Sequence, residues 1–214
     1  MYFSASHNAT VHCVGAATST NIRGPFNALR ESIACPVDVG GAIDPSGYRD
    51  SDGTYYVAYK IDGNSVGGSG GKLDTPLMLQ RMEGNAVTPD GSEPTTLLHR
   101  EAQDGPNIEA PSIAKNGDTY FLTFSSNSYD TTDYDVNYAT APAVTGPYTR
   151  AGSNLLVSGD DSVGGTLAAP GGSDFNEDGS KILFHAFQNG VNISDGRSLW
   201  AANLIYDGSS ISIA

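Results

Sequence analysis

A repeat of about 60 to 65 residues runs through this chain of 214 residues and constrains its fold more than any other sequence feature. Residues 52–57 (DGTYYV) align without a gap with residues 117–122 (GDTYFL), 65 positions later, and Asp178-Gly179 follows a further 61 positions on. Residues 17–26 (ATSTNIRGPF) recur as residues 139–148 (ATAPAVTGPY), 122 positions later. Because a repeated sequence folds into a repeated unit, the sequence predicts an array of similar modules.

Each repeat is predicted to form four short strands. A first strand is followed by a turn containing Asp-Gly or Asn-Gly, an aromatic strand, a third strand, a Gly-Pro turn and an outer strand. The 26 glycines, 11 prolines and 11 tyrosines, with only 16% charged residues, also favour a turn-rich all-β protein. Four short antiparallel strands per repeat are typical of a β-propeller blade, and such blades must stack around an axis to bury both faces.

The repeat begins out of phase with the chain. Residues 1–6 (MYFSAS) resemble residues 122–127 (LTFSSN), which lie within a unit and not at its start. The sequence therefore predicts one partial propeller domain over residues 1–214, with about three and a half blades. A remnant, residues 1–34, precedes blades at about residues 35–105, 106–165 and 166–214. We expect either an N-terminally truncated propeller or an open ring, whose exposed strand edges carry an aggregation risk.

Two acidic residues begin the expected first strands. The ungapped alignment places Ile43-Asp44 over Ile108-Glu109, and residues 169–172 (APGG) take this place in the last unit. First strands of propeller blades face one central channel, so Asp44 and Glu109 are expected at the mouth of a shared pocket. A carboxylate is costly to bury unless it is paired, and paired carboxylates are what glycoside hydrolysis requires. The alternative is that both acids cap turns by accepting hydrogen bonds from backbone N–H groups.

The charge and the cysteines limit the partners and the compartment. A net charge of −13 argues against nucleic acid or an anionic membrane surface as a partner, whereas a neutral sugar is compatible. No apolar run is long enough to span a membrane, and residues 1–6 lack the pattern of a signal peptide.

Sequons at Asn8 and Asn192 give slight support for secretion. Cys13 and Cys35 are expected to form a disulfide, the alternative being two buried thiols.

Taken in order, these motifs resemble glycoside hydrolase family 43, and above all its secreted fungal members. The resemblance covers essentially the whole chain and is carried by residues 12–26, 41–60 (GAIDPSGYRDSDGTYYVAYK), 59–67, 75–80, 107–113 (NIEAPSI), 120–129, 137–148 and 181–186. It implies a five-bladed propeller, an extracellular location and an inverting hydrolase similar to arabinanases, α-L-arabinofuranosidases and β-xylosidases. The implied substrates are plant polysaccharides or oligosaccharides that contain arabinose or xylose.

The resemblance also assigns roles to the acids. Glu109 matches the general acid, and Asp44 matches a third carboxylate that orients the acid and modulates its proton affinity. Spacing alone would suggest Asp44 as the general base. The base of the family is an aspartate of the first blade, in a part of the pattern that precedes the match to Met1, so no residue here takes that position. The second hypothesis is therefore a non-catalytic carbohydrate-binding propeller or an inactive fragment.

Further residues are expected to contact the sugar. Arg197 resembles a family arginine that reaches the substrate, although an exposed strand arginine is the alternative. Ile43, Tyr48 and Gly172 are expected beside the substrate. The rings of Tyr48, Tyr129 and Trp200 could stack on a sugar, although aromatic residues are more often part of a core. The glycine-rich residues 62–71 are expected to line the rim of the pocket.

We expect neither a cofactor nor a metal. Many family members carry Pro-Gly-His where the first strand of the last repeat begins, near a central ion or water. Residues 170–172 read Pro-Gly-Gly here, which puts a structural calcium in doubt. A structural role is expected for His185. The remaining histidines, His7, His12 and His99, show no spacing typical of metal ligands.

Overall fold

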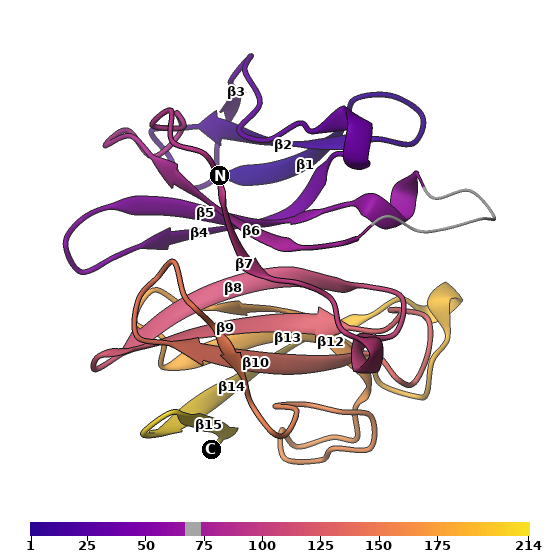
Figure 1. The fold of residues 1–214 in the computed structure, drawn as a ribbon. Coiled ribbons are helices and arrows are strands. Elements are labelled where there is room, and N and C mark those ends of the chain that lie inside the picture. The colour runs from indigo at the N-terminus through magenta and orange to yellow at the C-terminus, as the bar shows by residue number, and fades with distance from the viewer. Residues whose placement is uncertain (67–73) are drawn as a thin grey trace. The chain divides into compact units, whose positions relative to one another are not determined.

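The computed structural model describes residues 1–66 and 74–214, and its contacts divide the chain into two compact units, Met1–His99 and Arg100–Ala214. Figure 1 shows the strands of both units, and each unit is described here by itself. Half of the glycine-rich stretch that we expected at the pocket rim, residues 67–71, lies outside the described residues. The described helices are all short 3-10 segments, in agreement with the lack of helical periodicity in the sequence. None of the helices in the described part of the chain has the length and apolar character that a membrane span requires.

The first unit contains a three-stranded and a four-stranded antiparallel sheet, each with its strands in sequence order. The three-stranded sheet consists of β1 (Tyr2–Ser6), β2 (His12–Thr18) and β3 (Asn27–Ala28). The four-stranded sheet consists of β4 (Ala42–Arg49), β5 (Tyr55–Ile61), β6 (Leu77–Met82) and β7 (Thr95–Leu98). Short helical turns lie at η1 (Val37–Val39) and η2 (Gly63–Ser65).

Side chains from both sheets form the core of the first unit. Most of its members are strand residues at alternating inward positions, because successive side chains of a strand point to opposite faces. The cluster consists of Ile33, which lies between β3 and η1, and of the strand residues Val14, Ala16, Ala42, Val57, Tyr59, Ile61 and Met82. A disulfide joins Cys13 of β2 to Cys35, 22 residues further on. The bond ties the segment after β3 back to the sheet and removes loop entropy from the unfolded chain.

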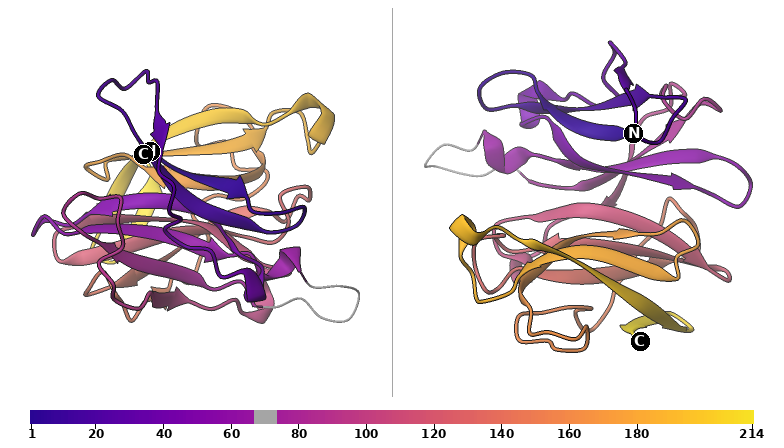
Figure 2. Two further views of the ribbon diagram at one scale, coloured as in Figure 1. Left: turned by 90° about the horizontal axis from the view of Figure 1, so that it is seen from above. Right: turned by 180° about the vertical axis from the view of Figure 1, so that it is seen from behind.

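The second unit contains two four-stranded antiparallel sheets, again in sequence order. The first consists of β8 (Ile108–Asn116), β9 (Thr119–Ser126), β10 (Asp135–Ala141) and β11 (Thr149–Arg150). The second consists of β12 (Ala168–Phe175), β13 (Lys181–Phe187), β14 (Ser198–Asp207) and β15 (Ser210–Ile213). Helical turns lie at η3 (Ala102–Asp104) and η4 (Ile193–Asp195). Figure 2 shows the strands of both sheets from two further directions.

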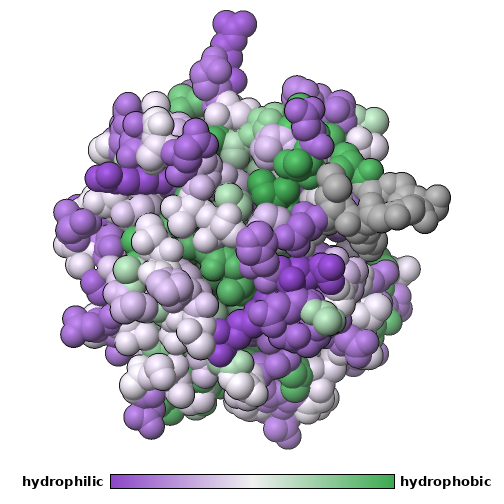
Figure 3. All heavy atoms as spheres, viewed as in Figure 1, coloured by the Kyte–Doolittle hydropathy of each residue, from purple (hydrophilic) through white to green (hydrophobic). Residues whose placement is uncertain are grey.

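Strand alternation places one face of the last sheet on the core of the second unit. Along β14 the side chains alternate between half-buried and exposed, so Trp200 and Leu204 pack against a cluster that includes Phe121 and Phe184. The opposite face remains in solvent, where Leu199 is 76% exposed. On the face drawn in Figure 3, most atoms belong to hydrophilic or neutral residues, and hydrophobic atoms appear in groups between them.

The four sheets confirm the prediction of an all-β fold with about three and a half blades. Three of the sheets have the four sequential antiparallel strands of a blade. The strand β1 is equivalent to β9, which is the second strand of the sheet β8–β11, as the similarity of residues 1–6 to residues 122–127 predicts. The Gly-Pro motifs lie between β2 and β3 and between β10 and β11, at equivalent points of two sheets.

The first strands β4, β8 and β12 share a bulge that repeats in detail. Each strand shifts its register with the following strand just before Ser46, Ser112 and Gly171 respectively, and β12 shifts a second time between Gly171 and Asp174. Within each bulge one residue has a positive φ and is followed by a proline; these residues are Asp44 (54°), Ala110 (52°) and Ala169 (49°). A positive φ is uncommon for residues other than glycine. Three equivalent bulges show that the repeat extends to backbone conformation.

The bulges correct the alignment of the two acids. Asp44 is equivalent to Ala110, and Glu109 is equivalent to Ile43, so the first strands are offset by 66 residues and not by 65. The cause is one extra residue in a turn. Five residues, 50–54, separate the paired residues Arg49 and Tyr55, whereas four, 116–119, separate Lys115 and Tyr120. The aromatic second strands keep the offset of 65, which is why an ungapped alignment misplaces the first strands.

Candidate active site

Glu109 is the second residue of β8, half-buried, and immediately precedes the bulge residue Ala110. The hydroxyl of Tyr134 donates a hydrogen bond of 2.6 Å to Oε1 of Glu109. Nδ2 of Asn107 donates one of 3.1 Å to Oε2, and the same amide also donates to the carbonyl of Asn127. Two donors from different segments therefore hold the two carboxylate oxygens in a defined orientation.

Tyr134 lies just before β10 and is only 2% exposed. Its ring lies parallel to the imidazole of His185, with ring centroids 6.3 Å apart and an angle of 9° between the planes. Glycine at position 171 makes room for this ring, because a Cβ there would lie 1.9 Å from Cε1 of Tyr134. Sequence reasoning missed Tyr134, since no repeat or spacing connects it with Glu109, 25 residues earlier.

Gly172, a residue that we expected beside the substrate, lies next to His185. Its φ is +60°, and an added Cβ would lie 2.3 Å from Nε2 of His185. Its N–H donates to Oγ of Ser125 at 2.9 Å. A histidine at position 172 would therefore meet the imidazole of His185 as well as a strained backbone. The Gly-Gly pair and the aromatic residues that face it fit one another sterically.

His185 and Arg197 form a hydrogen-bonded pair, with Nη1 of Arg197 3.1 Å from Nε2 of His185. Burial, and second the positive charge of Arg197, lower the pKa of His185 to about 4. Because a guanidinium only donates hydrogen bonds, Nε2 of a neutral His185 accepts and the proton resides on Nδ1. Nδ1 is buried, with no hydrogen-bond partner among the residues that the structure describes. The acceptor atom of the imidazole, Nε2, is thus engaged by Arg197.

A pocket of about 450 Å³ opens beside this pair. Its walls come from β13 and from the segments around η4 and Tyr129; the lining residues are Tyr129, His185, Phe187, Ile193, Gly196 and Arg197. The guanidinium of Arg197 lies 5.3 Å from the ring centroid of Tyr129, which is 47% exposed. Apolar and aromatic faces with one hydrogen-bonding fork are suited to a sugar ring. Trp200, by contrast, packs against the core of the second unit.

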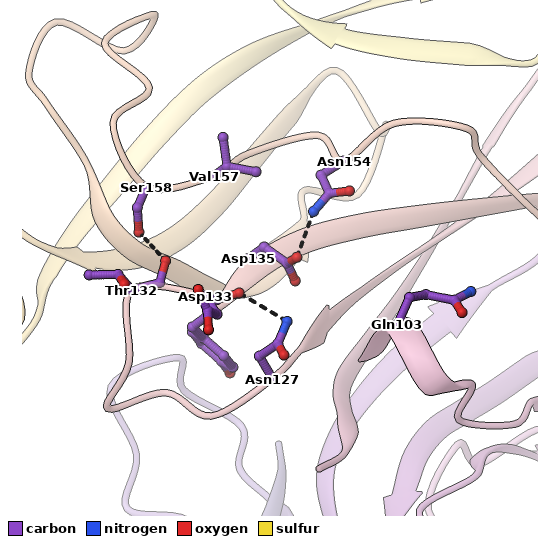
Figure 4. Close-up of a pocket in the computed structure, with 9 residues that line it drawn as sticks. Gln103, Asn127, Thr132, Asp133, Asp135, Asn154, Val157 and Ser158 are labelled. Carbon is purple, nitrogen blue, oxygen red and sulfur yellow. Dashed lines mark hydrogen bonds between the residues drawn. The ribbon is translucent and has the colours of Figure 1, made fainter. Parts of the chain in front are cut away.

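A second, more polar pocket of about 410 Å³ lies where β9 ends and β10 begins (Figure 4). Asp135 forms its wall, and burial raises the pKa of this carboxyl although Ser126 and Asn137 donate to it. In Figure 4, Asn154 reaches the other oxygen of Asp135, while Asn127 and Ser158 donate to backbone carbonyls. These hydrogen bonds tie the loops around β10 together, which indicates a structural role.

Asp44 belongs to the first unit and is the third residue of β4. The residue is half-buried, and its backbone N–H donates to Oγ of Ser4 at 3.1 Å. Ile43 pairs across the sheet with Lys60. Tyr48, further along β4, points its hydroxyl to Oδ1 of Asp50 at 3.4 Å, near the turn that leads to β5.

Lys60 is a polar residue that sequence reasoning overlooked. It is 1% exposed, and its Nζ lies 3.4 Å from Oδ1 of Asp62. A lysine is almost never fully buried unless it is paired. Its position within the apolar strand of residues 55–61 was the available signal.

One group of potential metal ligands occurs among the described residues. Atoms of His7, Cys13 and Cys35 lie within 4.8 Å of one another. Both sulfurs belong to the disulfide and are therefore not available as thiolate ligands.

Comparisons with known proteins identify the family. The model of glycosyl hydrolases family 43 matches residues 1–207. A thermostable family-43 glycoside hydrolase matches with a TM-score of 0.80 and 23% identity over 100% of this chain and 70% of its own. An endo-1,4-beta-xylanase from Bacteroides thetaiotaomicron matches with a TM-score of 0.75 and 25% identity, over 100% of this chain and 69% of its own. The native arabinanase from Bacillus subtilis matches with a TM-score of 0.70 and 21% identity, over 99% and 70%.

A search of curated proteins finds no match. The structural matches confirm the predicted propeller class, and the family match covers nearly the whole chain, as the sequence motifs predicted. The protein is thus a member of a family of glycosidases: it belongs to glycosyl hydrolases family 43.

Proposed function

We propose that this chain hydrolyses glycosidic bonds in plant polysaccharides or oligosaccharides that contain arabinose or xylose, with inversion at the anomeric carbon. The observation that carries the proposal is the carboxylate of Glu109, which two donors orient at the start of β8 in a chain of family 43. The substrate class is supported by the similarity to a xylanase and to an arabinanase. A further structural match is an alpha-L-arabinofuranosidase from Lactobacillus brevis.

In this proposal Glu109 is the general acid, which protonates the glycosidic oxygen as the bond to the anomeric carbon breaks. Asp44 has the role that the resemblance implies, a third carboxylate that orients the acid and modulates its proton affinity. Arg197 and Tyr129 contact a sugar in the 450 Å³ pocket, with the guanidinium donating to hydroxyls and the ring stacking on the sugar face. Chemistry of this kind uses carboxylates and water, so we expect no cofactor.

Inversion requires a base that activates water on the opposite face of the sugar, about 6.5–9.5 Å from the acid. We assign no residue of this chain to that role. This gives the alternative, a propeller that binds the same carbohydrates without cleaving them, since loss of a general base commonly costs about 10²–10⁴-fold in rate. We also propose an extracellular location, which the disulfide supports because such bonds persist in oxidising compartments.

The test is an assay of the chain on aryl α-L-arabinofuranosides and aryl β-D-xylosides beside Glu109→Gln, with the anomer of the first product determined by NMR. The proposal predicts activity that Glu109→Gln abolishes, and a product of inverted configuration. Calorimetric titration with arabino- and xylo-oligosaccharides is run in parallel on chains that melt cooperatively. Binding without hydrolysis would support the alternative, and a retained anomer would contradict the inverting mechanism.

A further inference from the structure

We propose that Tyr134 is a positioning residue that determines which oxygen of Glu109 delivers the proton; the inference rests on the proposed role of Glu109 as general acid. The hydroxyl of Tyr134 donates to Oε1 at 2.6 Å, and the amide of Asn107 donates to Oε2 at 3.1 Å. An oxygen that accepts a short hydrogen bond already has the hydroxyl hydrogen directed at it, and binding a proton of its own is therefore disfavoured. The transferable proton of Glu109 therefore resides on Oε2.

The contact with Asn107 is compatible with this assignment. A protonated Oε2 keeps a lone pair that can still accept from the amide of Asn107, whose nitrogen only donates. In the reaction, the Oε2–H bond breaks and the proton forms a bond with the glycosidic oxygen. The electron pair of the bond between that oxygen and the anomeric carbon goes to the departing oxygen, while a water molecule bonds to the anomeric carbon and releases a proton to solvent. Glu109 is left as a carboxylate whose two oxygens accept from Tyr134 and Asn107, and hydrogen bonds to a charged acceptor are the stronger ones.

The surroundings of Tyr134 keep its hydroxyl in one direction. The residue is 2% exposed, and its ring lies parallel to His185. The backbone of Gly171 lies so close to the ring that an added Cβ would come within 1.9 Å of it. Because the ring is buried and Gly171 confines its edge, the packing favours the orientation in which the hydroxyl is directed at Oε1. Tyr134 thus lies between Glu109, to which it donates, and His185, which accepts a hydrogen bond from Arg197.

The first experiment compares Tyr134→Phe with Tyr138→Phe, a matched control in which a buried tyrosine of the neighbouring strand loses its hydroxyl. Both variants and the wild-type chain are assayed on aryl glycosides with good and poor leaving groups. Only a poor leaving group needs full protonation, so Tyr134→Phe is expected to lower kcat on it by about 10–100-fold, and much less on a good one. Equal losses on both substrates would overturn the proposal, because a merely structural role affects both alike.

The second experiment does not depend on hydrolysis. The carboxyl carbon of Glu109 is followed by NMR in glutamate-labelled protein, and its signal is assigned by its loss in Glu109→Gln. Loss of the hydrogen bond from the hydroxyl of Tyr134 is expected to move the chemical shift of this carbon in Tyr134→Phe and to leave it in place in Tyr138→Phe. An unchanged chemical shift in Tyr134→Phe would overturn the proposal. An inactive chain that shows the expected shift would contradict the proposed function alone.

Discussion

Nη1 of Arg197 lies 3.1 Å from Nε2 of His185, and this pair is compatible only with a neutral imidazole. A protonated His185 would present a donor to a donor and a second positive charge to Arg197. Burial is the largest cause of the shift, and together with the charge of Arg197 it lowers the pKa of His185 to about 4. The pair therefore links the shape of the proposed sugar pocket to the protonation state of one residue.

We predict that His185 makes the folded state lose stability as the pH falls from about 6.5 to about 4. The pKa is about 6.5 in the unfolded chain and about 4 in the folded one, so between these values only the unfolded chain binds the proton. The contribution is fully present above pH 6.5 and is lost toward pH 4. His185→Gln, which keeps an acceptor for Arg197, should show a shallower loss of urea midpoint over this range. Parallel curves for wild type and variant would contradict the prediction.

A second prediction concerns the close contact between Gly171 and Tyr134. In Gly171→Ala the added methyl group would overlap the ring, so the ring or the strand must shift. We expect a destabilisation of about 1–3 kcal/mol, as for other overpacked sites. The matched control is Gly152→Ala, because a Cβ at Gly152 meets nothing within 4 Å. Equal unfolding free energies for the two variants in urea would show that the contact is not tight.

A third prediction concerns the ion pair that ties η3 to β11. Nη1 and Nη2 of Arg150 each lie 2.8 Å from an oxygen of Asp104, whose side chain is 2% exposed. Asp104→Ala leaves the charge of Arg150 largely buried and should cost about 3–5 kcal/mol in unfolding free energy. The double variant Asp104→Leu/Arg150→Met should recover most of this loss. A double variant as unstable as the single one would indicate that another contact of Asp104 carries the stability.

The strands and the blades could be predicted from the sequence because their signals are local. The alternation of apolar and polar residues, the aromatic strands and the turn dipeptides lie within a few residues of one another, and they recur in each sequence repeat. The site was harder to predict. Glu109 and Arg197 were noted from their motifs, whereas Tyr134 and Lys60 were missed because neither lies in a motif whose chemistry is evident from spacing.

The sequence by itself determined the all-β class, the repeat and the family, since each depends on patterns written along the chain. Tertiary structure decided the register and the contacts. One extra residue between Arg49 and Tyr55 makes Asp44 equivalent to Ala110, and a strand shifted by one residue turns its side chains to the other face. Folding alone brings Tyr134 to Glu109 and Arg197 to His185, because side chains distant in sequence acquire their hydrogen bonds only when the strands pack.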